Sequence, residues 1–144
     1  MIDLDRFKGI NDEHGHLAGD AVLVETARRL IRVIRPYDLL GRFGGEEFVV
    51  VQHAVGHTSD AGPAERMRRA IEQPAYDLGG MELCVTASLG VASSRQAASP
   101  LELLRLADEA LYRAKRGGRN RVEVAAAAPE PQGAGGTAIL VPDA

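Results

Sequence analysis

The sequence contains one cysteine, no tryptophan, few aromatic residues and no long hydrophobic run. A single cysteine in 144 residues excludes an internal disulfide framework, and a hydrophobic content of 45% is enough for a buried core. No apolar stretch reaches the ~20 residues of a membrane-spanning helix, and the acidic start does not resemble a signal peptide. We therefore expect one cytoplasmic domain and no membrane segment in this chain.

An excess of positive charge is also missing. The formal net charge is -3, which disfavours a broad surface for nucleic acid or anionic lipid. Any phosphate recognition must then come from locally placed lysine and arginine. The lone thiol, Cys84, lies in a run of alternating polar and apolar residues, so we expect it to be buried in a strand.

Hydrophobic periodicity predicts both helices and strands. Strands are expected at residues 1–4, 39–43, 47–51, 81–92 and 121–124, with a hairpin turn at Gly44 and Gly45. Helices are expected at residues 18–34, 64–72 and 100–116, the last one capped by Ser99. In the first helix Val24 and Ile31 are assigned to the apolar face and Arg29 to the opposite, polar face.

The last part of the chain changes in composition. Residues 126–144 are rich in alanine, proline and glycine and show no periodicity, so they cannot bury enough apolar surface to offset the entropy of ordering. We expect a disordered tail there and a folded domain over residues 1–125.

Acidic residues follow two of the predicted strands. Asp3 and Asp5 end the first strand, and Glu46 and Glu47 follow the hairpin glycines. If these strands are neighbours, the carboxylates meet, and such hard oxygen ligands suit Mg²⁺, which takes one or two carboxylates plus phosphates and water. Either pair alone is more simply explained as solvated loop charge.

Five segments, in order and spacing, resemble signatures of the GGDEF family of diguanylate cyclases. They are Asp-Leu-Asp-Arg-Phe-Lys-Gly-Ile-Asn-Asp (3–12), His-Gly-His-Leu-Ala-Gly-Asp (14–20), Arg-Phe-Gly-Gly-Glu-Glu-Phe (42–48), Thr-Ala-Ser-Leu-Gly-Val-Ala (86–92) and Ala-Leu-Tyr-Arg-Ala-Lys-Arg-Gly-Gly-Arg-Asn-Arg-Val (110–122). The resemblance spans residues 1–124. It implies an α+β domain with a mainly antiparallel central sheet and surrounding helices, similar to nucleotide cyclases and polymerase palms (ferredoxin-like).

The resemblance also implies a reaction, the condensation of two GTP into cyclic di-GMP and two pyrophosphates. Asp3, the carbonyl of Leu4 and Glu46 would hold Mg²⁺, with Mn²⁺ as an alternative, and Glu47 would assist a second ion. Glu46 or Glu47 would take the proton of the attacking 3′-hydroxyl. Gly44 and Gly45 would let the backbone approach the nucleotide closely; they are equally suited to an ordinary hairpin turn.

Further positions match the GTP-binding residues of the family. Asn11 and Asp20 would bind guanine, because a carboxylate accepts the N1–H and N2–H donors that adenine lacks. Lys115 and Arg119 would bind the β- and γ-phosphates, with additional contacts from Phe7 and Lys8. Without that context, Asn11 is a loop residue, Asp20 suits a helix start and the two cations suit a helix end.

A possible control site lies before the hairpin. Arg35 and Asp38 resemble the Arg-x-x-Asp site at which the product, cyclic di-GMP, binds and inhibits many family members. An alternative is that Arg35 only caps its helix. Because the product is two-fold symmetric, the resemblance implies that two chains must face each other as a homodimer.

The chain departs from the family pattern at its start. Family domains begin earlier, with a helical segment that covers the sheet, so residues 1–125 are expected to form a domain lacking its usual N-terminal helix. One alternative is therefore a catalytically inactive receptor for GTP or cyclic di-GMP. A second is another Mg²⁺-dependent nucleotide cyclase or palm enzyme, which Asn11 and Asp20 disfavour.

Overall fold

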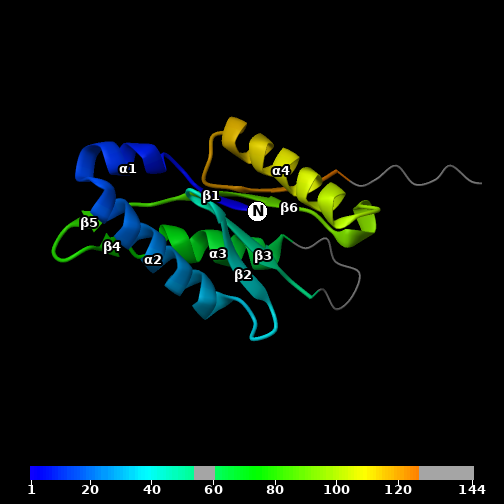
Figure 1. Ribbon diagram of the computed structural model, residues 1–144, viewed down its shortest axis with the longest axis horizontal. Helices are drawn as coiled ribbons and strands as arrows, with labels where there is room; N and C mark the ends of the chain where they lie inside the picture. Colours follow the sequence, from blue (N-terminus) through cyan, green and yellow to red (C-terminus); the bar gives the residue numbers. More distant parts are fainter. Residues whose placement is uncertain (54–60, 127–144) are drawn as a thin grey trace, which may run out of the picture.

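A computed structural model describes residues 1–53 and 61–126 (Figure 1). Apart from Ala126, the predicted tail lies outside these residues. Within the described part of the chain, no helix is both long and apolar enough to cross a bilayer.

A five-stranded sheet forms the centre of the fold, with strand order β2-β3-β1-β6-β7. The strands are β1 (Ile2–Leu4), β2 (Leu39–Gly44), β3 (Glu47–Val51), β6 (Ala87–Val91) and β7 (Val122–Val124). Three pairings are antiparallel and only β6–β7 is parallel. The predicted α+β class with a mainly antiparallel sheet is confirmed.

Strand β1 is at the middle of this sheet and carries its most buried side chains. Ile2 and Leu4 are 2% and 1% exposed, and they belong to the hydrophobic core together with Phe48 and Leu89 on the neighbouring strands. Asp3 lies between them in the sequence, so the packing of Ile2 and Leu4 in the core holds its backbone in place.

Four helices surround the sheet: α1 (Phe7–His14), α2 (His16–Val33), α3 (Gly62–Glu72) and α4 (Pro100–Arg116). Helix α4 packs on β6 and β7 on one side, and α3, itself covered by α2, packs on the other (Figure 1). A side chain at Gly90 would place its Cβ 2.1 Å from the Ala107 carbonyl oxygen. Glycine at this position in β6 is therefore what lets α4 approach the sheet so closely.

Two predicted elements are wrong. No helix was predicted for residues 7–14, and Asn11 was described as a loop residue, but this segment forms α1, in which Phe7 is the only buried residue. The single strand expected at residues 81–92 is split into β6 and the short β5 (Glu82–Leu83), which pairs with β4 (Tyr76–Asp77) in a separate sheet. Val85 turns into the core at the break, so Cys84 is exposed rather than buried.

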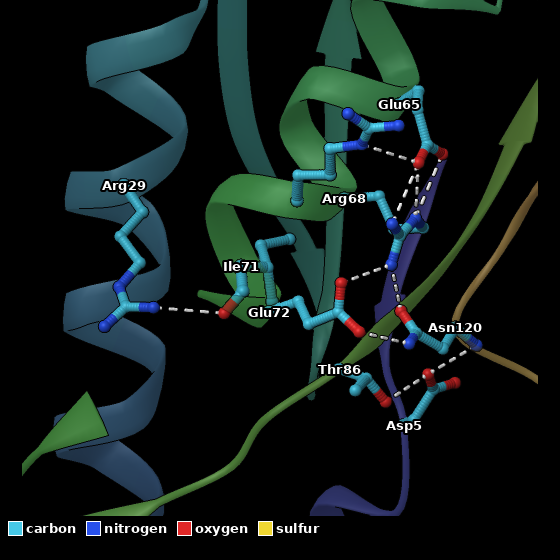
Figure 2. A network of polar contacts seen from close by, with 9 residues as sticks. Asp5, Arg29, Glu65, Arg68, Ile71, Glu72, Thr86 and Asn120 are labelled. Atoms are coloured by element: carbon cyan, nitrogen blue, oxygen red, sulfur yellow. Dashed lines mark hydrogen bonds and ion pairs between the residues drawn. The ribbon is translucent and has the colours of Figure 1, made fainter. Parts of the chain in front are cut away.

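The polar face of α2 was also predicted incorrectly. Arg29 is only 8% exposed. It donates a hydrogen bond to the carbonyl of Ile71 (3.1 Å) in the last turn of α3 (Figure 2) and another to the carbonyl of Ala75 (3.1 Å) in the segment that follows the helix. Val24 and Ile31, expected in the core, are exposed instead. The buried face of α2 therefore differs from the predicted one. The carbonyls at the end of α3 need hydrogen-bond donors, which an apolar helix face cannot provide.

Candidate functional site

The sheet brings the acidic residues of β1 and of the hairpin together. In the antiparallel pairing of β1 with β3, Asp3 is opposite Glu47. The Leu4 amide donates to the Glu46 carbonyl at 3.3 Å, so the hairpin tip lies beside the end of β1. The side chains do not form a ready-made metal cage, because no group of three His, Cys, Asp or Glu ligands converges among the described residues.

Asp3 is a buried carboxylate paired with a lysine. Its side chain is 8% exposed, and Lys115 Nζ lies 2.6 Å from its Oδ2. Burial raises the pKa of Asp3; Lys115 lowers it, and the charges of Glu46 and Glu47 raise it, with a net increase. Three carboxylates against one lysine leave a local excess of negative charge that favours a cation.

The available donors fit Mg²⁺ rather than a softer metal. The Asp3 and Glu46 carboxylates and the Leu4 carbonyl offer oxygen alone; Asp3 and Leu4 belong to β1, and Glu46 belongs to the turn of the neighbouring hairpin. Mg²⁺ completes its shell with water and substrate phosphates, so a set of one or two carboxylates suffices.

The hairpin tip has room for a ligand. The two turn residues are Gly45 and Glu46, one position later than predicted, and Arg42 donates to the Gly45 carbonyl at 2.7 Å. Neither Gly44 nor Gly45 has a positive φ, and a Cβ at Gly45 would meet nothing within 4 Å. The turn conformation therefore does not itself demand glycine at position 45.

The start of α1 follows directly after β1. Arg6 precedes the helix in a left-handed conformation (φ 57°), and no side chain caps the first turn. The Phe7 side chain is buried and Lys8 is exposed, so this turn offers backbone amides and one lysine. Uncapped amides and the helix dipole make such a turn suitable for an anionic group.

Asn11 and Asp20 lie on α1 and α2, which pack against each other. The Asn11 side chain fills the space beside Gly19, where an added Cβ would be 1.9 Å from Asn11 Oδ1. Asp20 follows Gly19 and is exposed. The structure thus places the two predicted guanine-binding residues at one helix contact.

Lys115 and Arg119 lie at the end of α4 and in the loop that follows it. Lys115 is in the last turn, and Arg119 is exposed with a positive φ of 65°. Arg119 lines a cavity of about 480 Å³ together with Arg6 and Gly9 from the start of α1. The loop that carries Arg119 and the start of α1 thus border the same cavity, which also contacts Asp5 just after β1.

Asp5 has a different role from Asp3, although the two were predicted together as acidic residues at the end of the first strand. Its carboxylate accepts hydrogen bonds from Thr86 Oγ1 (2.7 Å) and the Asn120 amide (3.0 Å) (Figure 2), and a third from Ser88 Oγ (2.7 Å). Both oxygens are occupied, so Asp5 fastens the sheet and the loop after α4. Asn120 was not among the predicted site residues, although it follows Arg119 directly and lies in the segment 110–122 that resembles the family.

Arg35 and Asp38 lie in the turn between α2 and β2. Asp38 is 7% exposed, and its Oδ2 accepts hydrogen bonds from the Arg35 amide and Gln52 Nε2, both at 3.0 Å. Burial would raise the pKa of Asp38, but these hydrogen bonds, with a further one from the His53 backbone and the Arg35 charge, lower it overall. Its Oδ1 is buried without a partner among the described residues.

Arg35 itself is exposed. The amide of Ile34, and not the Arg35 side chain, caps α2 by donating to Leu30, and the Arg35 guanidinium lies 5.9 Å from the centre of the Tyr37 ring. The helix-capping alternative therefore has no contact to support it.

Comparison with known proteins identifies the family. Residues 1–121 match the sequence profile described as "Diguanylate cyclase, GGDEF domain". The chain is 43% identical over 125 residues to diguanylate cyclase DgcP of Pseudomonas aeruginosa and 42% identical over 123 residues to diguanylate cyclase A of Treponema denticola. These alignments cover 87% and 85% of the chain but only 19% and 33% of those relatives.

Solved structures give the same result. The GGDEF domain of DgcB from Caulobacter crescentus, in complex with c-di-GMP, aligns with a TM-score of 0.79 at 35% identity, over 86% of this chain and 74% of that one. Diguanylate cyclase SiaD of Pseudomonas aeruginosa, in complex with its activator SiaC, aligns with a TM-score of 0.79 at 43% identity, over 86% and 48%. With its sequence profile, close relatives and fold in agreement, this chain belongs to the GGDEF domain family of diguanylate cyclases.

Proposed function

We propose that this chain is a diguanylate cyclase domain that condenses two GTP into cyclic di-GMP and two pyrophosphates. The observation that supports this most strongly is the position of Asp3, a buried carboxylate of raised pKa in register with Glu47 and beside the hairpin tip. A buried carboxylate needs a strong positive partner to remain charged, and the site provides both a lysine and room for a metal ion.

The GTP contacts follow from the same geometry. Asn11 and Asp20 bind guanine at the contact of α1 and α2. The triphosphate lies toward the first turn of α1, which offers the Phe7 and Lys8 amides and the Lys8 side chain, and toward Arg119, which lines a cavity beside Arg6 and Gly9. Lys115, now on Asp3, moves to the phosphates when a divalent cation takes its place on that carboxylate.

In the reaction, Asp3, the Leu4 carbonyl and Glu46 would hold Mg²⁺, and Glu47 would assist a second ion. When bound, the metal would lower the pKa of the 3′-hydroxyl and neutralise charge on the phosphates. A Glu46 or Glu47 carboxylate oxygen accepts the hydroxyl proton, the 3′-oxygen bonds to the α-phosphorus of the other GTP, and that phosphorus loses pyrophosphate. Each chain holds one GTP, so two chains must face each other as a homodimer.

The direct test is product analysis. Purified protein is incubated with GTP and Mg²⁺, and the nucleotides are separated by chromatography. Cyclic di-GMP and pyrophosphate in a 1:2 ratio are the expected products. A different cyclic or linear nucleotide would contradict the proposal, whereas folded protein that binds GTP without turnover would favour the receptor alternative. The specific observation for that alternative is the buried Oδ1 of Asp38, which has no partner among the described residues.

Base selectivity provides a second prediction. Asp20→Ala should lower the preference for GTP over ATP by about tenfold or more, because the carboxylate that accepts two guanine donors is lost. The measurement is competition of each nucleotide against labelled GTP. Asp12→Ala, which removes another exposed carboxylate near α2, is the matched control and should keep the preference. Equal selectivity in the Asp20 variant would show that the base is read elsewhere.

We also propose that Arg35 and Asp38 bind the product. The exposed Arg35 guanidinium is close to the Asp38 carboxylate, one oxygen of which has no partner within residues 1–53 and 61–126. Together the two side chains suit the donor edge of guanine and a phosphate. Arg35→Ala should weaken cyclic di-GMP binding about tenfold in calorimetric titration, as expected for the loss of a charge-assisted contact. Arg32→Ala, an exposed arginine on α2, should leave the affinity unchanged. Equal effects of the two variants would indicate a general charge effect rather than a site.

A further inference from the structure

Asn120 is the meeting point of a polar network that joins α3, β1 and the loop after α4 (Figure 2). Its backbone amide donates to Asp5 Oδ2 at 3.0 Å. Its side chain bridges two residues of α3, accepting a hydrogen bond from Arg68 Nη1 and donating one to Glu72 Oε1 at 2.7 Å. The residue thus uses backbone and side chain to hold two different parts of the fold.

The α3 end of this network is rigid. The Arg68 side chain is 12% exposed and forms ion pairs with Glu65 and Glu72, each at 2.8 Å. The hydrogen bond from Asn120 and the ion pair with Arg68 lower the pKa of Glu72 below its ordinary value, so Glu72 stays ionised at neutral pH. Charged partners on both sides make the bonds to Asn120 charge-assisted and directional.

The loop has few other means of fixing its shape. It follows α4 through Gly117 and Gly118, and both Arg119 and Asn120 adopt positive φ, at 65° and 47°. Within residues 1–53 and 61–126 the Arg119 side chain has no hydrogen-bond or ion-pair partner. An unusual backbone conformation persists only where surrounding contacts hold it, and here the contacts of Asn120 act together with the hydrogen bond of the Arg119 amide to the Ala114 carbonyl at 3.0 Å.

The network also connects the loop to the metal-binding end of β1. Asp5, which accepts the Asn120 amide, is two residues beyond Asp3 in the chain. Arg119, the residue before Asn120, lines the cavity next to the start of α1. A shift of Asn120 would therefore move the Arg119 cation relative to Asp3.

We propose that Asn120 is a positioning residue that aims Arg119 at the terminal phosphates of GTP. The inference rests on the proposed function, because it needs Arg119 to contact the triphosphate. Asn120 touches no substrate; it sets the direction of the Arg119 backbone through Asp5, Arg68 and Glu72. Its effect should consequently depend on the presence of the β- and γ-phosphates and on the presence of Arg119.

The test is a double-mutant cycle on nucleotide binding. The whole chain is titrated with 3′-deoxy-GTP, which lacks the attacking hydroxyl, and with GMP, which lacks the β- and γ-phosphates. Asn120→Gly, which keeps the positive φ accessible, should weaken 3′-deoxy-GTP about tenfold and change GMP by less than about twofold. In an Arg119→Ala background the same substitution should cost no more than about twofold.

Two controls separate positioning from stability. Thr26→Val removes the buried hydrogen bond to Tyr76 far from the loop, so it should lower the melting temperature but not the affinity for 3′-deoxy-GTP. Glu72→Ala removes one hydrogen-bond partner of Asn120 without altering the sequence of the loop. It should weaken the binding of 3′-deoxy-GTP, as Asn120→Gly does. This second variant gives an answer even if the glycine variant folds poorly.

The outcomes distinguish the inference from the function on which it rests. Multiplicative effects of the Asn120 and Arg119 substitutions, or equal weakening of GMP and 3′-deoxy-GTP, would overturn the positioning role alone. Absence of any GTP binding by the parent chain would overturn the proposed function and the inference with it.

Discussion

Glu46→Ala is expected to abolish cyclic di-GMP formation while leaving the fold unchanged. The Glu46 carboxylate is at the hairpin tip, beside the end of β1, and no described contact of its side chain supports the core. The variant loses a proposed metal ligand and a proposed proton acceptor at once. We expect turnover to fall about 10²- to 10⁴-fold, measured by chromatography of products at saturating GTP and Mg²⁺.

Three controls accompany this prediction. Glu13→Ala removes an exposed carboxylate of α1 and should retain the parent rate. Chelation of divalent cations by EDTA should stop the parent enzyme, and added Mg²⁺ should restore it. A Glu46→Ala protein with the parent's turnover and melting temperature would remove Glu46 from the proposed mechanism.

Arg29→Ala should destabilise the domain more than any other single substitution on α2. The variant loses an almost fully buried guanidinium that binds the carbonyls ending α3, pairs with Glu25 at 3.1 Å and lies 3.8 Å from the centre of the Tyr76 ring. Those carbonyls would be left without donors. We expect the free energy of unfolding to fall by about 3 kcal/mol or more, measured by urea denaturation.

The neighbouring Arg28 offers a matched control for this measurement. Its side chain is 67% exposed and approaches Glu25 only at 3.9 Å. Arg28→Ala should change the free energy of unfolding by less than about 0.5 kcal/mol. Similar losses in both variants would mean that the polar contacts of Arg29 contribute little beyond those of a surface arginine.

Local signals explain which parts of the fold could be predicted. Helix α4 has an N-cap at Ser99, whose side chain accepts the Glu102 amide, followed by proline and ended by glycine, so its bounds were found from sequence. The hairpin was predicted for similar reasons. Helix α1 has no cap and one buried residue, so only its packing against α2 defines it.

Long-range contacts explain what was missed. The alternation of residues 81–92 continues through the break at Cys84, and nothing local reveals that Thr86 must turn its carbonyl to the Asp5 amide at 2.8 Å. Arg29 looked like a surface residue because the carbonyls that it binds belong to another helix. Hydrophobic periodicity indicates which face of an element is polar, but it does not indicate which residue of another element that face will contact.

The candidate site, too, was only partly predictable from the sequence. Residue type and spacing pointed to Asp3, Glu46 and Glu47, and the sheet register brings them together. The ion pair of Lys115 with Asp3 and the bond of Asn120 to Asp5 join opposite ends of the chain, and no sequence pattern encodes them. Their roles, like those of the other site residues, are proposals that the experiments above decide.

The central place of β1 has a consequence for how the chain folds. Ile2 pairs with both Phe48 and Leu89, so the sheet cannot close until β6 has been synthesised. Contacts of such large sequence separation slow folding, because the entropy of loop closure must be overcome before they form. Until then β1 has an unpaired, apolar edge. The nascent chain is therefore expected to be most prone to aggregation just before the residues of β6 emerge from the ribosome.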